Sequence, residues 1–96
     1  MSLRWSKYAL RDLEEIGDFI AEANLVAASK IVSRILGQTD LLAAHPHLGR
    51  AGRVLRTREL VISETDFIAA YRVVGENVEI LAVMHGARRW PDSFPK

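Results

Sequence analysis

Two apolar segments near the end of the chain carry the clearest pattern. Residues 67–74 and 78–84 are apolar at almost every position and rich in β-branched side chains. Between them lies Gly75-Glu76-Asn77, a three-residue turn signal that contains glycine. This arrangement is typical of a β-hairpin. Because both segments are almost uninterrupted, we expect them to lie centrally in a sheet with at least one face under helices.

The first half of the chain has helical periodicity instead. Apolar side chains recur every three or four residues from Lys7 to Glu22, and acidic side chains fill most of the other positions. This predicts an amphipathic helix with an acidic outer side, which begins after an N-cap at Ser6. Gly17 interrupts the helix, and close packing against a neighbouring helix is the preferred explanation.

A second helical segment follows Asn24, the next N-cap candidate. Its apolar positions keep helical spacing as far as Ala44. Pro46 prevents the helix from continuing and disfavours helical backbone at His45. Because only two or three residues connect the two helices, we expect them to pack as an antiparallel hairpin.

The remaining segments complete the order of elements. Residues 3–5 are expected to form a short strand, residues 46–52 a loop, and residues 58–63 a strand that leads into the hairpin. We therefore predict one α+β domain over residues 1–96, of order β-α-α-β-β-β, with the N-terminal helical hairpin on one face of a small antiparallel sheet. An irregular tail should follow Trp90. The expected core is Leu10, Leu13, Ile16, Ile20, Ile31, Val32, Ile35, Leu42, Ile68, Ile80 and Leu81.

Composition limits the chemistry that the chain offers. It has no cysteine, which excludes disulfides, thiol catalysis and thiolate metal sites. The formal net charge is +1, which argues neither for nor against a nucleic-acid partner. Ten of the 13 basic residues are arginine, which suits phosphate and carboxylate, although a coding bias would produce the same skew. No apolar stretch approaches the roughly 18 residues of a membrane span, so we expect a cytoplasmic protein.

The sequence contains no motif for a cofactor or a metal ion. A phosphate-binding glycine loop, an HExxH helix and a GxSxG turn are all missing. His45 and His47 flank Pro46 in the predicted loop, where two solvated side chains are the better expectation than a metal site. We therefore expect no cofactor and no metal.

His85 is the strongest candidate for chemistry. It stands where the last strand ends, and antiparallel pairing would bring Arg72 and Glu59 toward the same edge. A histidine, a carboxylate and arginines would suit general acid–base chemistry on a phosphodiester. The structural alternative is that His85 caps the strand through hydrogen bonds and that Arg72 pairs with an acid. Trp90 either closes the core against a helix or offers a surface on which a base stacks.

Five segments of the chain carry a family resemblance. They are ALRDLEEIGDFI at 9–20, HPHLGR at 45–50, RELV at 58–61, YRV at 71–73 and VMHGAR at 83–88. Together, from about Trp5 to Trp90, they resemble the ParE branch of the RelE/ParE toxins. The resemblance implies a toxin of a type II toxin–antitoxin system, a role in plasmid stabilisation, and a helical hairpin on an antiparallel sheet.

The resemblance leaves two targets open. ParE-like members poison DNA gyrase, whereas RelE-like members cut mRNA in the ribosomal A site. The nuclease alternative would use Glu59, Arg72, His85 and Arg88, because Arg72 matches a basic position of those nucleases and Arg88 or Arg89 falls near another. The chain lacks their lysine-rich basic set and a tyrosine after the last strand, which favours a gyrase inhibitor without catalysis of its own. The expected target-binding residues are Arg72, His85, Arg88, Arg89 and Trp90.

A cluster of arginines suggests where a second partner would bind. Arg50, Arg53, Arg56 and Arg58 lie within nine residues, with no acidic residue among them before Glu59. Such a cluster suits acidic side chains on a partner. We expect a ParD-like antitoxin to run over this segment, in the groove between the helical hairpin and the sheet edge, and to form a toxin–antitoxin hetero-oligomer.

Overall fold

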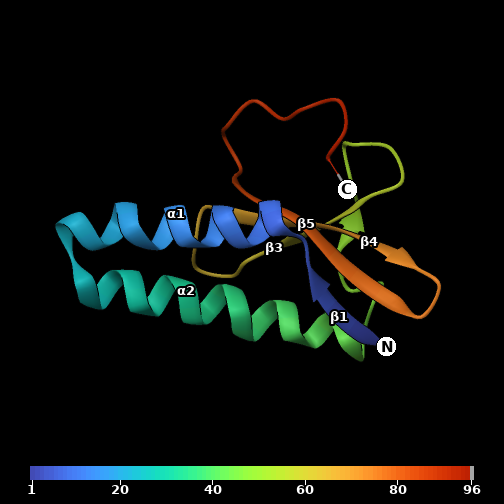
Figure 1. Ribbon diagram of the computed structural model, residues 1–96, viewed down its shortest axis with the longest axis horizontal. Coiled ribbons are helices and arrows are strands. Elements are labelled where there is room, and N and C mark those ends of the chain that lie inside the picture. The colour runs from blue at the N-terminus through green and yellow to red at the C-terminus, as the bar shows by residue number, and fades with distance from the viewer. Residues whose placement is uncertain (96) are drawn as a thin grey trace.

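The computed structural model describes residues 1–95 (Figure 1). Its elements are β1 (Ser2–Trp5), α1 (Lys7–Ala23), α2 (Leu25–Asp40), the 3-10 helix η1 (Leu41–Ala43), β2 (Arg50–Ala51), β3 (Arg58–Val61), β4 (Phe67–Val74) and β5 (Asn77–His85). Within these residues, five strands form one sheet in the order β1-β5-β4-β3-β2. The predicted fold class, with a helical hairpin packed on a small and mostly antiparallel sheet, is confirmed.

The β4–β5 hairpin lies at the centre of the sheet, as predicted. Its strands pair from Phe67 opposite His85 to Val74 opposite Asn77. Two details differ from the prediction. β1 pairs in parallel with β5, because the helical hairpin carries the chain across the sheet before it returns. The predicted loop contains the two-residue strand β2, which pairs with the start of β3.

Both predicted N-caps are confirmed. The side chains of Ser6 and Asn24 accept hydrogen bonds from the backbone amide three residues later, at 3.1 and 3.0 Å. Asn24 alone connects the two helices, so the connection is shorter than predicted. α2 ends at Asp40 rather than at Ala44, because the last turn tightens into η1.

The two helices cover one face of the sheet, and the main core lies between the layers. Fully buried Tyr71 and Val78 of the sheet belong to this core together with Ala9 of α1. Five of the expected core residues are buried as predicted. They are Ile35, Leu42, Ile68, Ile80 and Leu81.

The other expected core residues lie on the helices and are less buried. Leu10 is 51% exposed, so its prediction was wrong. The half-buried ones are Leu13, Ile16, Ile20, Ile31 and Val32. Figure 1 shows that the far halves of α1 and α2 extend beyond the sheet, where the two helices pack mainly against each other and bury less surface. Leu10 lies at the near end of α1, directly after buried Ala9, and projects to a more exposed side of the helix. Gly17 permits that contact, since a Cβ atom there would lie 3.3 Å from Val32 Cγ2, and close packing is confirmed.

A smaller apolar cluster lies on the opposite face of the sheet. Ala70, Ala82 and Met84 are buried there, and Trp90 and Phe94 pack against them. Because successive side chains of a strand alternate between faces, this cluster is separate from the core under the helices. The irregular tail therefore covers the face that the helices leave open. Trp90 does close a core, but on this face rather than against a helix.

Tyr71 fixes the segment that leads into β2. Its hydroxyl accepts from the Gly49 amide at 2.9 Å and donates to the Pro46 carbonyl at 2.7 Å. A Cβ atom on Gly49 would come within 2.7 Å of both the Glu59 carbonyl oxygen and the Tyr71 ring. Only glycine fits this close approach, which holds the segment against β3.

Truncation of Ile35 tests where the core lies. Ile35→Ala removes a fully buried side chain and should lower the free energy of unfolding by about 2–5 kcal/mol. Leu10→Ala is the matched control, because Leu10 has the same helical periodicity but is half exposed; it should cost at most about 1 kcal/mol. Urea unfolding followed by circular dichroism measures both values. If both variants lost the same free energy of unfolding, Leu10 would be as buried as Ile35, and the described orientation of α1 would be wrong.

Candidate functional site

Glu59 organises the arginine segment. It lies on β3 with only 2% of its side chain exposed, and its carboxylate accepts from Arg53 Nε and Nη2 at 3.1 Å, the Arg53 amide at 2.8 Å and Arg50 Nη2 at 3.1 Å. The expectation of arginines without a nearby acid was therefore wrong for Arg50 and Arg53. The acid follows them in sequence, and the pairing of β2 with β3 brings Arg50 directly opposite it.

The buried position of Glu59 has an electrostatic consequence. Burial by itself raises the pKa of the Glu59 carboxyl, because a charged group loses its water shell. The hydrogen bonds from Arg53 and Arg50 outweigh this effect and hold the pKa below its ordinary value of 4.5. Glu59 is therefore a fixed carboxylate engaged by its partners, which makes it unsuitable as a general base.

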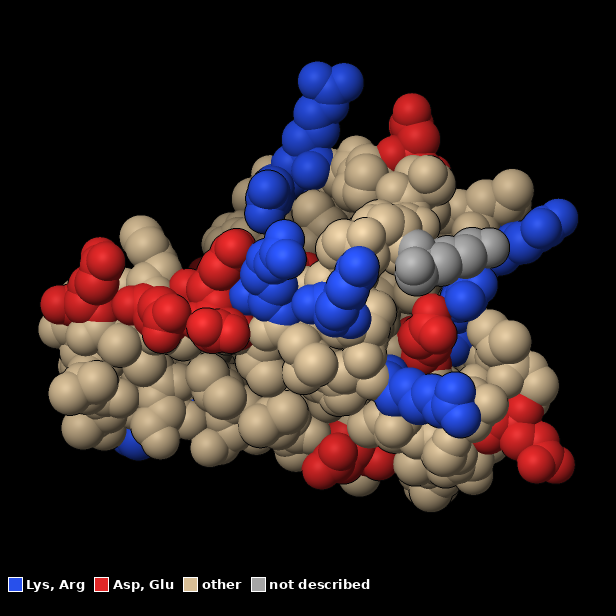
Figure 2. All heavy atoms as spheres, in the orientation of Figure 1, with Lys and Arg blue, Asp and Glu red and all other residues tan. Residues whose placement is uncertain are grey.

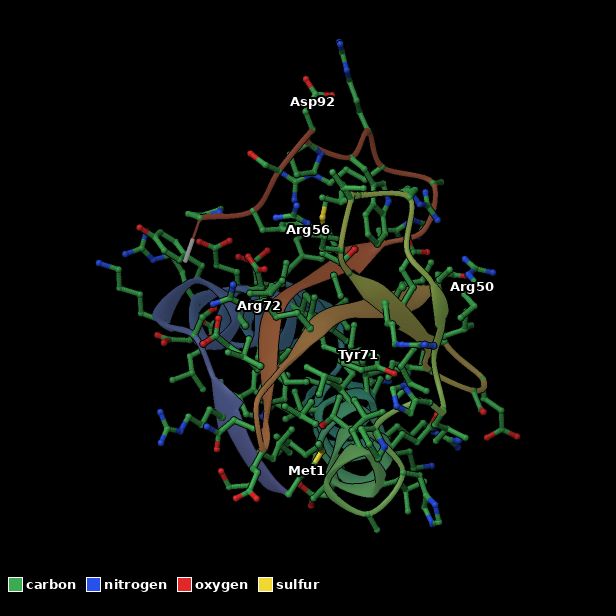
Figure 3. All side chains as sticks on the ribbon, turned by 90° about the vertical axis from the view of Figure 1, so that its right-hand side faces the viewer. Met1, Arg50, Arg56, Tyr71, Arg72 and Asp92 are labelled. Atoms are coloured by element: carbon green, nitrogen blue, oxygen red, sulfur yellow. The ribbon has the colours of Figure 1, made fainter. Side chains whose placement is uncertain are left out.

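The other two arginines of the segment have different environments. Arg58 is half-buried and donates from Nη1 to the Gly49 carbonyl at 2.9 Å. Arg56 is exposed, and its backbone has a φ of 63°, a left-handed conformation that is uncommon outside glycine. Figure 3 shows Arg50, Arg56 and Arg72 at separate positions around the sheet rather than around one centre. The segment thus offers Arg56 and the outer edge of Arg50 to a partner.

The residues of the predicted nuclease set are not brought together. Arg72 lies opposite Glu79 on β5 and contacts its carboxylate at 3.0 Å, as the structural alternative predicted. Glu79 and His85 are six positions apart on the same strand, which corresponds to about 20 Å at the usual rise per residue. The expectation that Arg72 stands beside His85 was therefore wrong, because the two residues occupy opposite ends of the hairpin.

His85 caps the end of β5. Its Nδ1 accepts from the Ala87 amide at 3.1 Å, and its ring packs edge-on against Phe67 with 5.8 Å between centroids. Nε2 lies 3.7 Å from a carboxylate oxygen of Asp66. These contacts agree with the structural alternative for His85. No three His, Asp or Glu side chains of residues 1–95 converge as metal ligands.

A groove of about 600 Å³ runs along β5 between α1 and the tail. Its floor is apolar and buried, whereas its arginines are exposed. The floor is Leu81, Ala82 and Met84, the α1 side is Tyr8 and Asp12, the tail side is Trp90, Pro91, Phe94 and Pro95, and the exposed cations are Arg88 and Arg89. In Figure 2 basic side chains gather in the middle of the visible face, beside the acidic side of α1.

The groove brings together three of the five predicted target-binding residues. Arg88, Arg89 and Trp90 line it, and Arg88 also borders a neighbouring hollow of about 270 Å³ that His85 lines. Four of the five predicted target-binding residues, His85, Arg88, Arg89 and Trp90, therefore line two adjoining hollows, and Arg72 lies outside both.

Two residues of this groove were missed by sequence reasoning. Tyr8 and Asp12 lie on α1, and Asp12 accepts a hydrogen bond from the Val83 amide of β5 at 3.0 Å. Burial raises the pKa of Asp12, and the Val83 amide only partly offsets this effect. Tyr8, Asp12 and Ile16 follow one another at intervals of four residues, which places them on one side of a helix. This spacing is a weak signal for the side that meets the sheet, and nothing in the sequence marks that side as part of a groove.

Comparisons with known proteins agree on one family. The family model described as "ParE toxin of type II toxin-antitoxin system, parDE" matches residues 3–90. The chain is 45% identical over 89 residues to "Putative toxin Y4kP" of Sinorhizobium fredii, covering 93% of this chain and 92% of that protein. It is 33% identical over 84 residues to "Toxin RelE2" of Caulobacter vibrioides, covering 88% and 93%.

A solved structure shows the same arrangement in three dimensions. The chain aligns with a chain of the "Chromosomal ParDE TA system from P. aeruginosa" at a TM-score of 0.79 and 32% sequence identity. The alignment covers 88% of this chain and 95% of that chain. Of the helices in residues 1–95, none is long and apolar enough to cross a membrane.

The buried carboxylate gives a pH-dependent prediction. Because the folded-state pKa of Glu59 is lowered, its contribution to stability is complete above about pH 4.5 and is lost as the pH falls through the folded-state value. Glu59→Gln lacks this contribution, so wild type should be more stable than the variant at pH 7 and the difference should shrink below pH 4.5. Urea unfolding at pH 7, 5, 4 and 3 measures the difference. A constant difference across this range would mean that Glu59 is not engaged as a carboxylate.

Proposed function

The chain belongs to the ParE toxin family of type II toxin–antitoxin systems, and on this basis we propose that it inhibits DNA gyrase by binding and is neutralised by a cognate antitoxin. The observation that carries the proposal is the groove beside β5, with its buried apolar floor and exposed Arg88 and Arg89. ParE-like toxins act on gyrase, and a groove of this kind suits a protein partner.

The groove has the features of a protein-binding site. Leu81, Ala82 and Met84 provide an apolar floor. Trp90 forms one wall, and tryptophan is among the residue types enriched at positions that dominate the binding energy of interfaces. Arg88 and Arg89 form no ion pair among residues 1–95, so they are available to carboxylates of a partner. Together these features suit a gyrase segment that presents an apolar side chain next to acidic ones.

The ribosome-dependent nuclease is the competing proposal, because one relative is named "Toxin RelE2". A nuclease of that kind needs an acid or base within hydrogen-bond reach of the proton that it moves. In this chain Glu59 is engaged by Arg50 and Arg53, and Arg72 lies about 20 Å along the hairpin from His85. The dispersed set supports binding over catalysis.

The antitoxin is proposed to contact the segment from Arg50 to Arg58. The family description and the solved ParDE system support a partner of this type. Arg56 is exposed and without an ion pair among residues 1–95, and the side chain of Arg50 is 56% exposed despite its contact with Glu59. Acidic residues of an antitoxin tail would find these two cations beside the edge strand β2.

Substitution of the groove arginines tests the gyrase proposal. The double variant Arg88→Ala/Arg89→Ala should raise the concentration needed to inhibit supercoiling by about tenfold or more, because it removes both exposed cations of the groove. Lys30→Ala, an exposed cation on α2, should inhibit like wild type. Supercoiling by purified gyrase measures the effect, beside an assay of mRNA cleavage on translating ribosomes. Intact supercoiling with cleaved A-site codons would replace the gyrase proposal by the nuclease.

Charge reversal at the arginine segment tests the antitoxin proposal. Arg56→Glu should weaken binding of the antitoxin and flatten its dependence on salt, because a favourable charge contact becomes repulsive. Lys30→Glu on α2 is the control with the same change in net charge, and it should leave both quantities near wild type. Isothermal titration at two salt concentrations measures them. The proposed surface would be wrong if the two variants bound alike.

A further inference from the structure

Arg53 joins the arginine segment to the tail. Its guanidinium binds Glu59 through Nε and Nη2, both at 3.1 Å, and lies over the indole ring of Trp90 with 4.0 Å to the ring centroid. One face of the guanidinium plane therefore meets an aromatic ring while two of its N–H groups meet a carboxylate. Arginine suits this double role because its flat, delocalised cation stacks and forks at the same time.

Glu59 fixes the plane of that guanidinium. Two parallel hydrogen bonds to one carboxylate define the orientation of the group, and the Arg53 amide adds a third bond to the same carboxylate at 2.8 Å. Glu59 lies on β3 and is buried, so its own position is set by the sheet. The indole ring of Trp90 thus rests on a cation that the sheet holds in place.

The tail has few other restraints. Residues 89–95 form no hydrogen bond to any residue of 1–95, either through the backbone or through a side chain. The buried Nε1 atom of Trp90 also has no hydrogen-bond partner among residues 1–95. What holds Trp90 is its packing on Ala70, Ala82 and Met84, an edge contact with Phe94 at 6.2 Å, and the stack on Arg53.

We propose that Arg53 is a positioning residue that, with Glu59, clamps Trp90 in place as the wall of the groove. The cation–π contact holds the face of the indole ring against the guanidinium, so a guanidinium that is fixed in place also sets the orientation of the ring. Without the clamp, Trp90 moves away from the sheet and the groove loses its tail side. The role of the groove in target binding rests on the proposed function; the clamp itself is a property of the free protein.

Tryptophan fluorescence tests the clamp directly. The chain has two tryptophans, so Trp5→Phe leaves Trp90 as the only one, and excitation at the red edge of the absorption band avoids the two tyrosines. In this background, Arg53→Ala should shift the Trp90 emission to longer wavelength and raise its quenching by acrylamide, toward the values of the urea-unfolded chain. Arg50→Ala is the matched control, because it also removes a Glu59 contact but does not touch the indole, and it should leave both values unchanged. Unchanged emission and quenching in Arg53→Ala would overturn the proposal.

A second variant covers the case in which Arg53→Ala does not fold. Arg53→Met/Glu59→Gln keeps side chains of similar size and removes both charges. It therefore avoids a buried carboxylate at position 59 that has lost the guanidinium of Arg53. Circular dichroism checks that it is folded. The folded variant should show the same shift and quenching of Trp90 as expected for Arg53→Ala. A shielded Trp90 in this folded variant would show that packing alone holds the ring.

Gyrase inhibition separates this inference from the proposed function. If the Trp5→Phe protein inhibits supercoiling, Arg53→Ala should inhibit less and Lys30→Ala should inhibit normally. Unchanged inhibition despite a released Trp90 would overturn the role of the ring as groove wall. If the Trp5→Phe and wild-type proteins both fail to inhibit gyrase, the proposed function fails, and the fluorescence result alone decides the clamp.

Discussion

The burial of one carboxylate determines how the β2–β3 segment and the tail that contacts it are arranged. Glu59 lies inside the sheet layer with 2% of its side chain exposed, and a charge in that position must be paired and hydrogen-bonded. Arg53 and Arg50 meet this requirement. Their convergence on Glu59 fixes the path of the chain between β2 and β3, and the position of Arg53 in turn determines where the indole ring of Trp90 lies.

The central hairpin imposes a second constraint because it is apolar on both faces. The helices cover one face, but they extend beyond the sheet and cannot reach the other. The tail covers the second face with two aromatic side chains, Trp90 and Phe94, and without regular secondary structure. Between α1 and the tail a groove remains along β5, with buried apolar residues at its floor and exposed arginines beside it.

The same geometry supports the proposal of binding over catalysis. General acid–base chemistry requires its groups within a few ångströms of one substrate. The long β4–β5 hairpin separates Arg72 from His85, and each already has a local partner, Glu79 for Arg72 and the Ala87 amide for His85. The groove beside β5 adds exposed Arg88 and Arg89, which form no ion pair among residues 1–95, and this composition suits the proposed protein interface.

Much of the fold was already determined by the sequence, because its signals are local. Helical spacing, the caps at Ser6 and Asn24, and the turn after β4 depend on neighbours within a few residues, and five segments in family order carried the resemblance. The tertiary structure decided what depends on residues far apart in the chain. Only the fold shows that Glu59 pairs with both Arg50 and Arg53, that Trp90 stacks on Arg53, and that Arg72 and His85 stand at opposite ends of a hairpin. It also decided that Leu10 is exposed, since helical spacing predicts an apolar stripe, but only the packed structure shows that α1 turns Ala9 and Asp12 toward the sheet.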